Sequence, residues 1–115
     1  MIKGIRGAIS VDENTTEAIE SASLELFKSI VEKNNLREKD VAYVEFTATK
    51  DLDKAYPAKF IRKNLGWNDT AFMCVQEMNV ENSLKKCIRV LVVVNCKENF
   101  KPVFVYLKDA ANLRG

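Results

Sequence analysis

Arg89 is a positive charge within an otherwise apolar stretch of the chain. Residues 87 to 95 read CIRVLVVVN, the pattern of a central β-strand that is apolar on both faces. A buried arginine is costly unless it has a partner, because removing a charge from water costs several kcal/mol. We therefore expect Arg89 either to form a structural salt bridge, for example with Glu77, or to bind a ligand anion.

Two further residues make an anion site the more attractive interpretation. Arg6 lies in a second strand-like segment between Gly4 and Gly7, where a backbone or a ligand could approach closely. Glu77 ends another strand-like segment, next to the connection that leads to Arg89. For a lone arginine the structural salt bridge is favoured, and these companions shift the balance toward a site.

The chain contains 0 histidines, which removes Ser-His and Cys-His nucleophilic catalysis and every His-ligated metal site. Its three cysteines, Cys74, Cys87 and Cys96, lack CxxC spacing, so we expect reduced thiols and neither a disulfide framework nor a metal site. Acid-base chemistry by carboxylate, lysine, tyrosine or cysteine remains, as does catalysis by fixed charge alone.

Length and composition predict one globular domain spanning residues 1–115. The chain weighs 13.1 kDa, is 47% hydrophobic and 30% charged, and carries a net charge of +2. The positive excess lies in residues 41–115, and this mild basic bias suits a small anionic ligand better than nucleic acid. The longest apolar run, residues 90–94, is far too short for a membrane span, so we expect a cytoplasmic protein. A deep pocket is hard to carve from so small a core, and sharing it between subunits would ease that difficulty.

Periodicity predicts an α+β domain with helices on one face of a sheet. Asn14 followed by Glu17 is an N-cap pattern for a helix from residue 15 to about 33, and Pro57 and Gly66 bound a short helix. A short tail is expected from residue 109 to 115. The expected strands are residues 2–9, 41–48, 70–77, 87–95 and 103–108.

Four separated motifs occur in the same order in a known family. They are GIRGA at 4–8, YPAKFIR at 56–62, CVQEM at 74–78 and LKKCIRV at 84–90. Together they resemble the small trimeric monofunctional chorismate mutases of the Bacillus type, nearly end to end. The resemblance implies a mixed five-stranded sheet with one long amphipathic helix and a short helix on one face. It also implies a homotrimer that forms a pseudo-α/β-barrel.

The resemblance further implies an isomerase that needs no cofactor and no metal. Such enzymes rearrange chorismate, a dianion, to prephenate on the way to phenylalanine and tyrosine, without nucleophile or proton transfer. By the resemblance Arg89 contacts the ether oxygen and a carboxylate, Arg6 and Tyr106 contact carboxylates, and Glu77 accepts a hydrogen bond from the ring hydroxyl. No nucleic acid or membrane partner is implied.

A second group of residues matches what the family brings to the site from an adjacent subunit. From the residues alone, we expect Lys59 and Arg62 to form a solvated helix face and Cys74 to be a small buried hydrophobic residue. The resemblance makes Cys74 a wall contact and not a nucleophile. Met73 and Tyr56 differ from the residues that are usual at these positions in the family. Because the tail after the last strand is short, the resemblance leaves open whether it covers the site. The implied substrate-binding residues are Tyr56, Ala58, Lys59, Arg62, Phe72, Met73, Cys74, Val75, Gln76, Tyr106, Leu113 and Arg114.

Two other functions remain as alternatives. One is a small-acid-binding trimer of the reactive-imine deaminase type, which also binds small acids through an arginine at subunit interfaces. The other is a nucleic-acid binder supported by Lys85, Lys86 and Arg89. Alternation sends Lys86 to the opposite side from the other two, so no continuous basic stripe forms. An assay on chorismate separates the first alternative from the mutase.

Overall fold

A computed structural model of the chain describes residues 1–113. Along the sequence the strands are β1 (Ile2–Ser10), β2 (Val41–Ala48), β3 (Ala71–Gln76), β4 (Cys87–Asn95) and β5 (Val105–Leu107). The helices are α1 (Thr16–Lys33) and α2 (Pro57–Leu65), with short 3-10 helices η1 (Glu38–Asp40) and η2 (Lys108–Asn112). None of the helices in residues 1–113 is long and apolar enough to cross a membrane.

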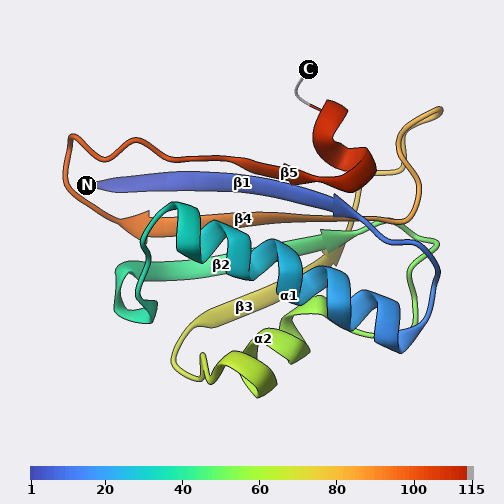
Figure 1. Ribbon diagram of the computed structural model, residues 1–115, viewed down its shortest axis with the longest axis horizontal. Helices are drawn as coiled ribbons and strands as arrows, with labels where there is room; N and C mark the ends of the chain where they lie inside the picture. Colours follow the sequence, from blue (N-terminus) through green and yellow to red (C-terminus); the bar gives the residue numbers. More distant parts are fainter. Residues whose placement is uncertain (114–115) are drawn as a thin grey trace.

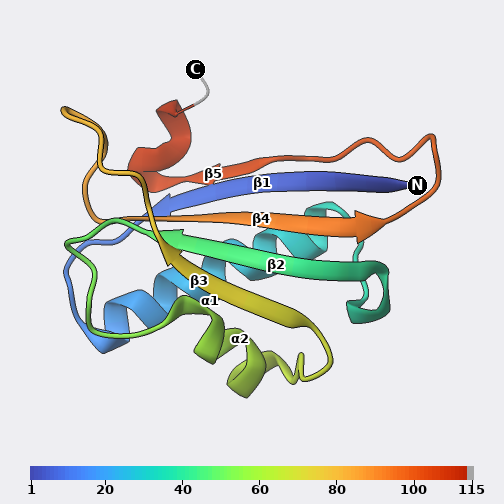
Figure 2. The ribbon, with the colours of Figure 1, turned by 180° about the vertical axis from the view of Figure 1, so that it is seen from behind.

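The five strands form one mixed sheet in the order β3-β2-β4-β1-β5. β4 pairs antiparallel with β1 and β2, while β2 pairs parallel with β3 and β1 pairs parallel with β5. Figure 1 shows α1 and α2 on the same side of this sheet, and Figure 2 shows the other side, which neither α1 nor α2 covers. We call that second side the open face.

Helix α1 presents an apolar stripe to the sheet, and its first turn is closed by a side chain. The Thr15 hydroxyl accepts a hydrogen bond from the Ala18 backbone N–H at 3.1 Å, so the N-cap is Thr15 and not the expected Asn14. Asn14 instead donates from its amide to Asp53 at 2.8 Å. The buried residues of α1 are Ile19, Ala22, Ser23, Leu26, Phe27 and Ile30.

Helix α2 begins at Pro57 and ends at Leu65, and Gly66 caps it, as the sequence indicates. Gly66 has φ of 70°, a left-handed conformation that glycine adopts without strain. The ring of Phe27 on α1 packs edge-on against Trp67, which follows α2, and the two ring centroids lie 4.9 Å apart. Both helices thus share one core with the covered side of the sheet.

The C-terminal region differs from the expectation. The strand predicted over 103–108 is confined to Val105–Leu107, and the expected tail begins as the 3-10 helix η2. Lys108 adopts φ of 52°, which turns the chain out of the strand direction. Ala110 of η2 is buried against Ala8 and Cys87 on the open face.

Candidate active site

A cavity of about 330 Å³ opens on the face of the sheet that the helices do not cover. All five strands or their ends contribute to it, since Arg6 comes from β1, Arg89 from β4 and Tyr106 from β5, while Glu77 directly follows β3. The sequence pattern singled out Arg6, Glu77 and Arg89, and the family resemblance added Tyr106. The cavity lining is completed by Gly7, Glu45, Thr47, Val90 and Leu91.

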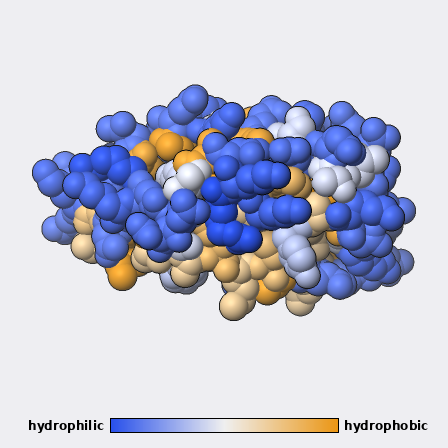
Figure 3. Space-filling model, turned by 90° about the horizontal axis from the view of Figure 1, so that it is seen from below, coloured by the Kyte–Doolittle hydropathy of each residue, from blue (hydrophilic) through white to orange (hydrophobic). Residues whose placement is uncertain are grey.

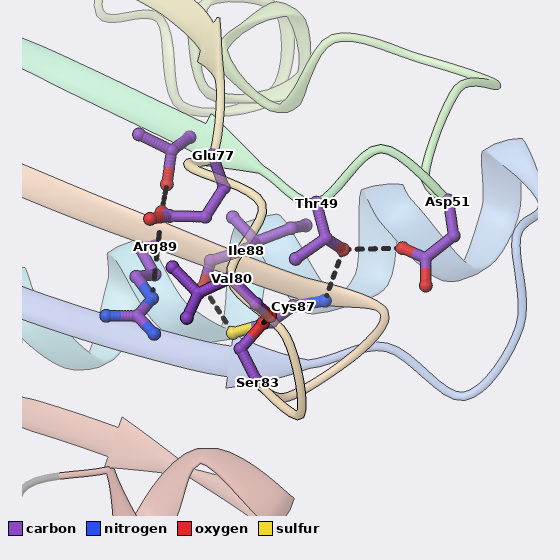
Figure 4. Close-up of polar contacts among 9 residues, drawn as sticks. Thr49, Asp51, Glu77, Val80, Ser83, Cys87, Ile88 and Arg89 are labelled. Atoms are coloured by element: carbon purple, nitrogen blue, oxygen red, sulfur yellow. Dashed lines mark hydrogen bonds and ion pairs between the residues drawn. The ribbon is translucent and has the colours of Figure 1, made fainter.

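Arg89 and Glu77 form a loose ion pair. The Arg89 Nε atom lies 3.6 Å from Glu77 Oε1, and the two side chains are 37% and 21% exposed. Figure 4 shows Glu77 reaching from the end of β3 over β4 toward Arg89. Because 3.6 Å exceeds hydrogen-bond distance, Nε is buried without a hydrogen-bond acceptor among the described residues. The expected pair of Arg89 with Glu77 exists, but it leaves the Nε–H group of the guanidinium without a hydrogen bond among the described residues.

Thr47 binds the same oxygen of this carboxylate that Arg89 approaches, and the sequence analysis did not name it. Its hydroxyl donates a hydrogen bond to Oε1 of Glu77. Thr47 lies on β2 directly opposite Arg89 in the antiparallel pairing with β4. The alternation of side chains along β2 assigns Thr47 to the open face, so the sequence could have predicted the face on which Thr47 lies. The register that sets it against Arg89 was not visible in the sequence.

Tyr106 brings an unused hydrogen-bonding group to the cavity. It lies on β5 beside Ala8 of β1 in the parallel pairing. Its phenolic oxygen is buried and has no hydrogen-bond partner within residues 1–113. Buried tyrosine hydroxyls normally find a partner, because an unsatisfied donor carries its full desolvation cost. Such a hydroxyl is available to an anionic ligand.

The cavity is electrostatically balanced. Arg6, exposed on β1 opposite Leu91 of β4, adds a second cation to Arg89, and Glu45 adds a second carboxylate to Glu77. Two positive and two negative side chains cancel. The cavity of one chain therefore offers a ligand hydrogen-bond donors in fixed positions but no net positive charge.

The second predicted group lies elsewhere, along the β3 edge and α2. Tyr56, Lys59, Cys74, Val75 and Gln76 contribute to a separate cavity of about 610 Å³, which the loop after β2 also lines. β3 and β5 are the two edges of the sheet, four strand spacings or about 19 Å apart. One chain does not bring the two groups together.

The remaining predicted residues line neither cavity. Ala58 is buried in the core, and Phe72 packs its ring against Phe27 and Phe46, which makes it a core residue in this chain. Arg62 and Met73 are exposed, and Leu113 packs against the cluster around Ala110. Arg114 lies outside the described residues.

Cys74 and Cys87 are both shielded thiols. Burial raises the pKa of the Cys74 thiol, against the lowering effect of the Ala58 backbone and the Arg62 charge. Burial likewise raises the pKa of Cys87, although the nearby Arg89 cation lowers it. A thiol held protonated is a poor nucleophile, so both residues act as small packing groups.

The comparisons with known proteins agree along the whole chain. The family model described as chorismate mutase type I matches residues 2–115. Chorismate mutase AroH of Bacillus subtilis (strain 168) is 43% identical over 115 residues, covering 99% of this chain and 91% of the relative. Chorismate mutase AroH of Thermus thermophilus is 40% identical over 116 residues, covering 99% and 94%.

A solved structure agrees with the fold as well. The chorismate mutase from Clostridium thermocellum superimposes with a TM-score of 0.89 at 46% sequence identity, covering 94% of this chain and 96% of that one. Sequence identity at this level over nearly the full length of each chain extends the likeness beyond the fold. The chain belongs to the chorismate mutase type I family.

Proposed function

We propose that this chain rearranges chorismate to prephenate in a site shared between two subunits of a homotrimer. One subunit contributes the cavity around Arg89, and its neighbour contributes the β3 edge and α2. The observation that carries this proposal is the convergence on one cavity of Arg6, Arg89 and the Tyr106 hydroxyl, which has no hydrogen-bond partner within residues 1–113.

The reaction suits a site made of fixed charges. In a Claisen rearrangement of one molecule a C–O bond breaks while a C–C bond forms, and no atom enters or leaves. The ether oxygen gains negative charge as its bond to carbon breaks. The site must therefore hold a compressed conformer of the substrate and place a donor at that oxygen. It needs neither a base nor the histidine that the chain lacks.

Arg89 is the donor for the ether oxygen. A preorganised donor aimed at developing charge contributes roughly 3–4 kcal/mol in other enzymes. The loose pairing with Glu77 supports this role, because it leaves guanidinium N–H groups for a ligand. Arg6 and the Tyr106 hydroxyl bind substrate carboxylate, and Glu77 accepts the hydrogen bond of the ring hydroxyl.

Charge balance supports a site completed by a neighbour. A dianion facing a cavity of zero net charge would lack compensation, whereas Lys59 and Arg62 of α2 supply two further cations. Both are exposed and neither has an ion-pair partner among the described residues. Arg114, with Leu113, would join the site from the end of the chain.

The open face supplies the surface for such an assembly. Met73 is 61% and Val75 39% exposed on β3, and Tyr43 is exposed on β2 opposite Ala71 of β3. Figure 3 shows apolar surface along its lower side. Three copies that cover these strands with one another would produce the pseudo-α/β-barrel that the family resemblance implies.

The direct test is to follow chorismate absorbance with purified protein and to identify the product. Conversion to prephenate by the wild-type chain, and its loss in Arg89→Ala, is the expected result. If the purified, folded chain leaves chorismate unchanged, or converts it equally well without Arg89, the proposed function is wrong.

A further inference from the structure

We propose that Thr47 is a positioning residue that holds Glu77 away from Arg89 and turns the free edge of its carboxylate toward the substrate. This inference rests on the proposed role of Glu77. It assigns to Thr47 no contact with the substrate. Its effect on the reaction passes through the carboxylate alone.

The geometry places Thr47 between the two charged residues. In the sheet Thr47 pairs with Arg89 of β4 on one side and with Val75 of β3 on the other. Its hydroxyl donates to Oε1 of Glu77, the same oxygen that Arg89 Nε approaches at 3.6 Å. Both contacts fall on Oε1, so the Oε2 edge is the one presented to a ligand hydroxyl.

Glu77 needs such an anchor because it lies beyond the end of β3. Its backbone N–H still donates to Ala48 at 2.9 Å, but its long side chain has several rotatable bonds. Threonine is branched at Cβ and is stiff in a strand, and its hydroxyl makes a strong hydrogen bond to a charged acceptor. A rigid donor on β2 thus fixes a flexible carboxylate after β3.

The anchor also keeps Arg89 available. Arginine and carboxylate side chains favour a bidentate pair at hydrogen-bond distance. Here the pair is held at 3.6 Å and Arg89 Nε has no hydrogen-bond acceptor among the described residues. Without the Thr47 hydroxyl, Glu77 would close on Arg89 and partly neutralise the cation that serves the ether oxygen. The loss would appear in kcat more than in KM.

The test compares three substitutions in the full-length protein. Thr47→Val removes the hydroxyl and keeps the shape, and we expect kcat to fall at least about tenfold while KM changes less than about threefold. Thr47→Ser keeps the hydroxyl and should recover most of kcat. Thr70→Val is the matched control, because Thr70 also donates its hydroxyl to a carboxylate, that of Glu38 at 2.9 Å, outside the site. It should leave kcat unchanged.

A double-mutant cycle separates positioning from a structural role. If Thr47 acts through Glu77, Thr47→Val should cause no further loss of kcat in a Glu77→Gln background. Additive losses, or a wild-type kcat in Thr47→Val when Glu77→Gln is impaired, would overturn the inference. A Glu77→Gln enzyme with unchanged kcat would instead overturn the proposed role of Glu77. Unfolding temperatures of all variants show that each comparison is made on folded protein.

Discussion

The guanidinium of Arg89 distinguishes a catalytic role from a structural one. A tightly buried pair with Glu77 would make Arg89→Ala lose about 3–5 kcal/mol of stability. The observed pair is loose and Arg89 is 37% exposed, which places it near the surface regime, where a pair contributes about 0–1 kcal/mol. Loss of activity in an Arg89 variant would then reflect chemistry and not unfolding.

Arg89→Lys is therefore the cleaner probe. Lysine keeps the charge but lacks the planar fork of donors, so we expect kcat to fall at least about a hundredfold while the protein stays folded. Steady-state kinetics together with thermal unfolding measure both quantities. A folded Arg89→Lys enzyme with nearly normal kcat would contradict the electrostatic mechanism and leave the fold untouched.

Tyr106→Phe should move stability and binding in opposite directions. The phenolic oxygen is buried with no hydrogen-bond partner among the described residues, so its removal relieves a desolvation cost in the free protein. We expect an unfolding temperature equal to or above that of the wild type. KM for chorismate should rise about tenfold, because one hydrogen bond to a carboxylate is lost. A variant with lower stability and unchanged KM would show that the hydroxyl serves the fold.

Among the connecting elements, the segment between β3 and β4 is tied down by Asp51. Its carboxylate accepts hydrogen bonds from the Lys86 backbone N–H, at 3.0 and 3.1 Å, and from the Thr49 hydroxyl at 2.5 Å. The Thr49 hydroxyl in turn accepts from the Cys87 N–H at the start of β4, as Figure 4 shows. This network fixes the strand end that carries Arg89.

The Asp51 network makes a stability prediction with a definite sign. Burial raises the pKa of Asp51, but the hydrogen bonds from Thr49 and Lys86 outweigh it and hold the pKa below its ordinary value. A lowered carboxyl pKa stabilises the fold above the unfolded-state pKa, and that stability is lost as the pH falls through the folded-state pKa. Asp51→Asn should thus unfold at a lower temperature than wild type at pH 7.

Thermal unfolding between pH 7 and pH 3 checks this prediction. The difference in unfolding temperature between the wild type and Asp51→Asn should begin to narrow as the pH falls below about 4, the ordinary carboxyl pKa at which the unfolded chain takes up its proton. It should keep narrowing as the pH approaches the lower pKa of Asp51 in the folded protein. A gap that stays constant over this range would mean that shape or packing, and not the ionised carboxylate, anchors the segment.

The elements themselves were largely predictable from local patterns. A strand is specified locally by the alternation of residues 41–48, and a short helix by Pro57 at its start and Gly66 just after its end. Both elements, β2 and α2, occur where expected. The N-cap was assigned to Asn14 because the sequence does not show that Asp53 would take its amide. The expected last strand ran past Leu107 because the turn at Lys108 depends on η2 packing against Ala8 and Cys87. It began too early because the backbone groups of Val103 pair with the Asn34 side chain, which the sequence does not show.

From the residue pattern alone the candidate site was predictable only where the chemistry was unusual, and residues such as Tyr106, Lys59 and Arg62 came from the family resemblance. An arginine inside an apolar strand called for a partner, and Glu77 was named for it. Thr47 and Glu45 are ordinary polar residues of a strand, and only the pairing register of β2 with β4 brings them to Arg89. Register depends on the whole sheet, and composition and spacing do not reveal it.

At the scale of the whole molecule, the chain leaves one side of its sheet without a second layer. Beside its charged cavity this face exposes apolar side chains such as Met73 and Val75, which gain stability when they are covered, and both helices lie on the other side. Of the two groups of predicted site residues, one lies on this open face and the other at the β3 edge. A neighbouring subunit would solve both problems at once, by covering the face and by supplying Lys59 and Arg62.

A shared site predicts recovery of activity in mixtures of inactive variants. Arg89→Ala breaks the first group, and the double variant Lys59→Ala/Arg62→Ala breaks the second, so each alone should be inactive. In any mixed cyclic trimer one of the three interfaces pairs an intact first group with an intact second group. Co-refolding equal amounts should form mixed trimers three times in four and restore about a quarter of wild-type activity per chain.

The matched control mixes two variants that break the same group. Arg6→Ala and Arg89→Ala both damage the open-face cavity, so no interface in their mixed trimers contains an intact first group. This mixture should stay inactive, while light scattering gives about three times 13.1 kDa for every sample. Equal recovery in both mixtures would point to subunit exchange that merely rescues folding. No recovery in the first mixture despite trimer formation would place each site within a single chain, contradicting the shared site.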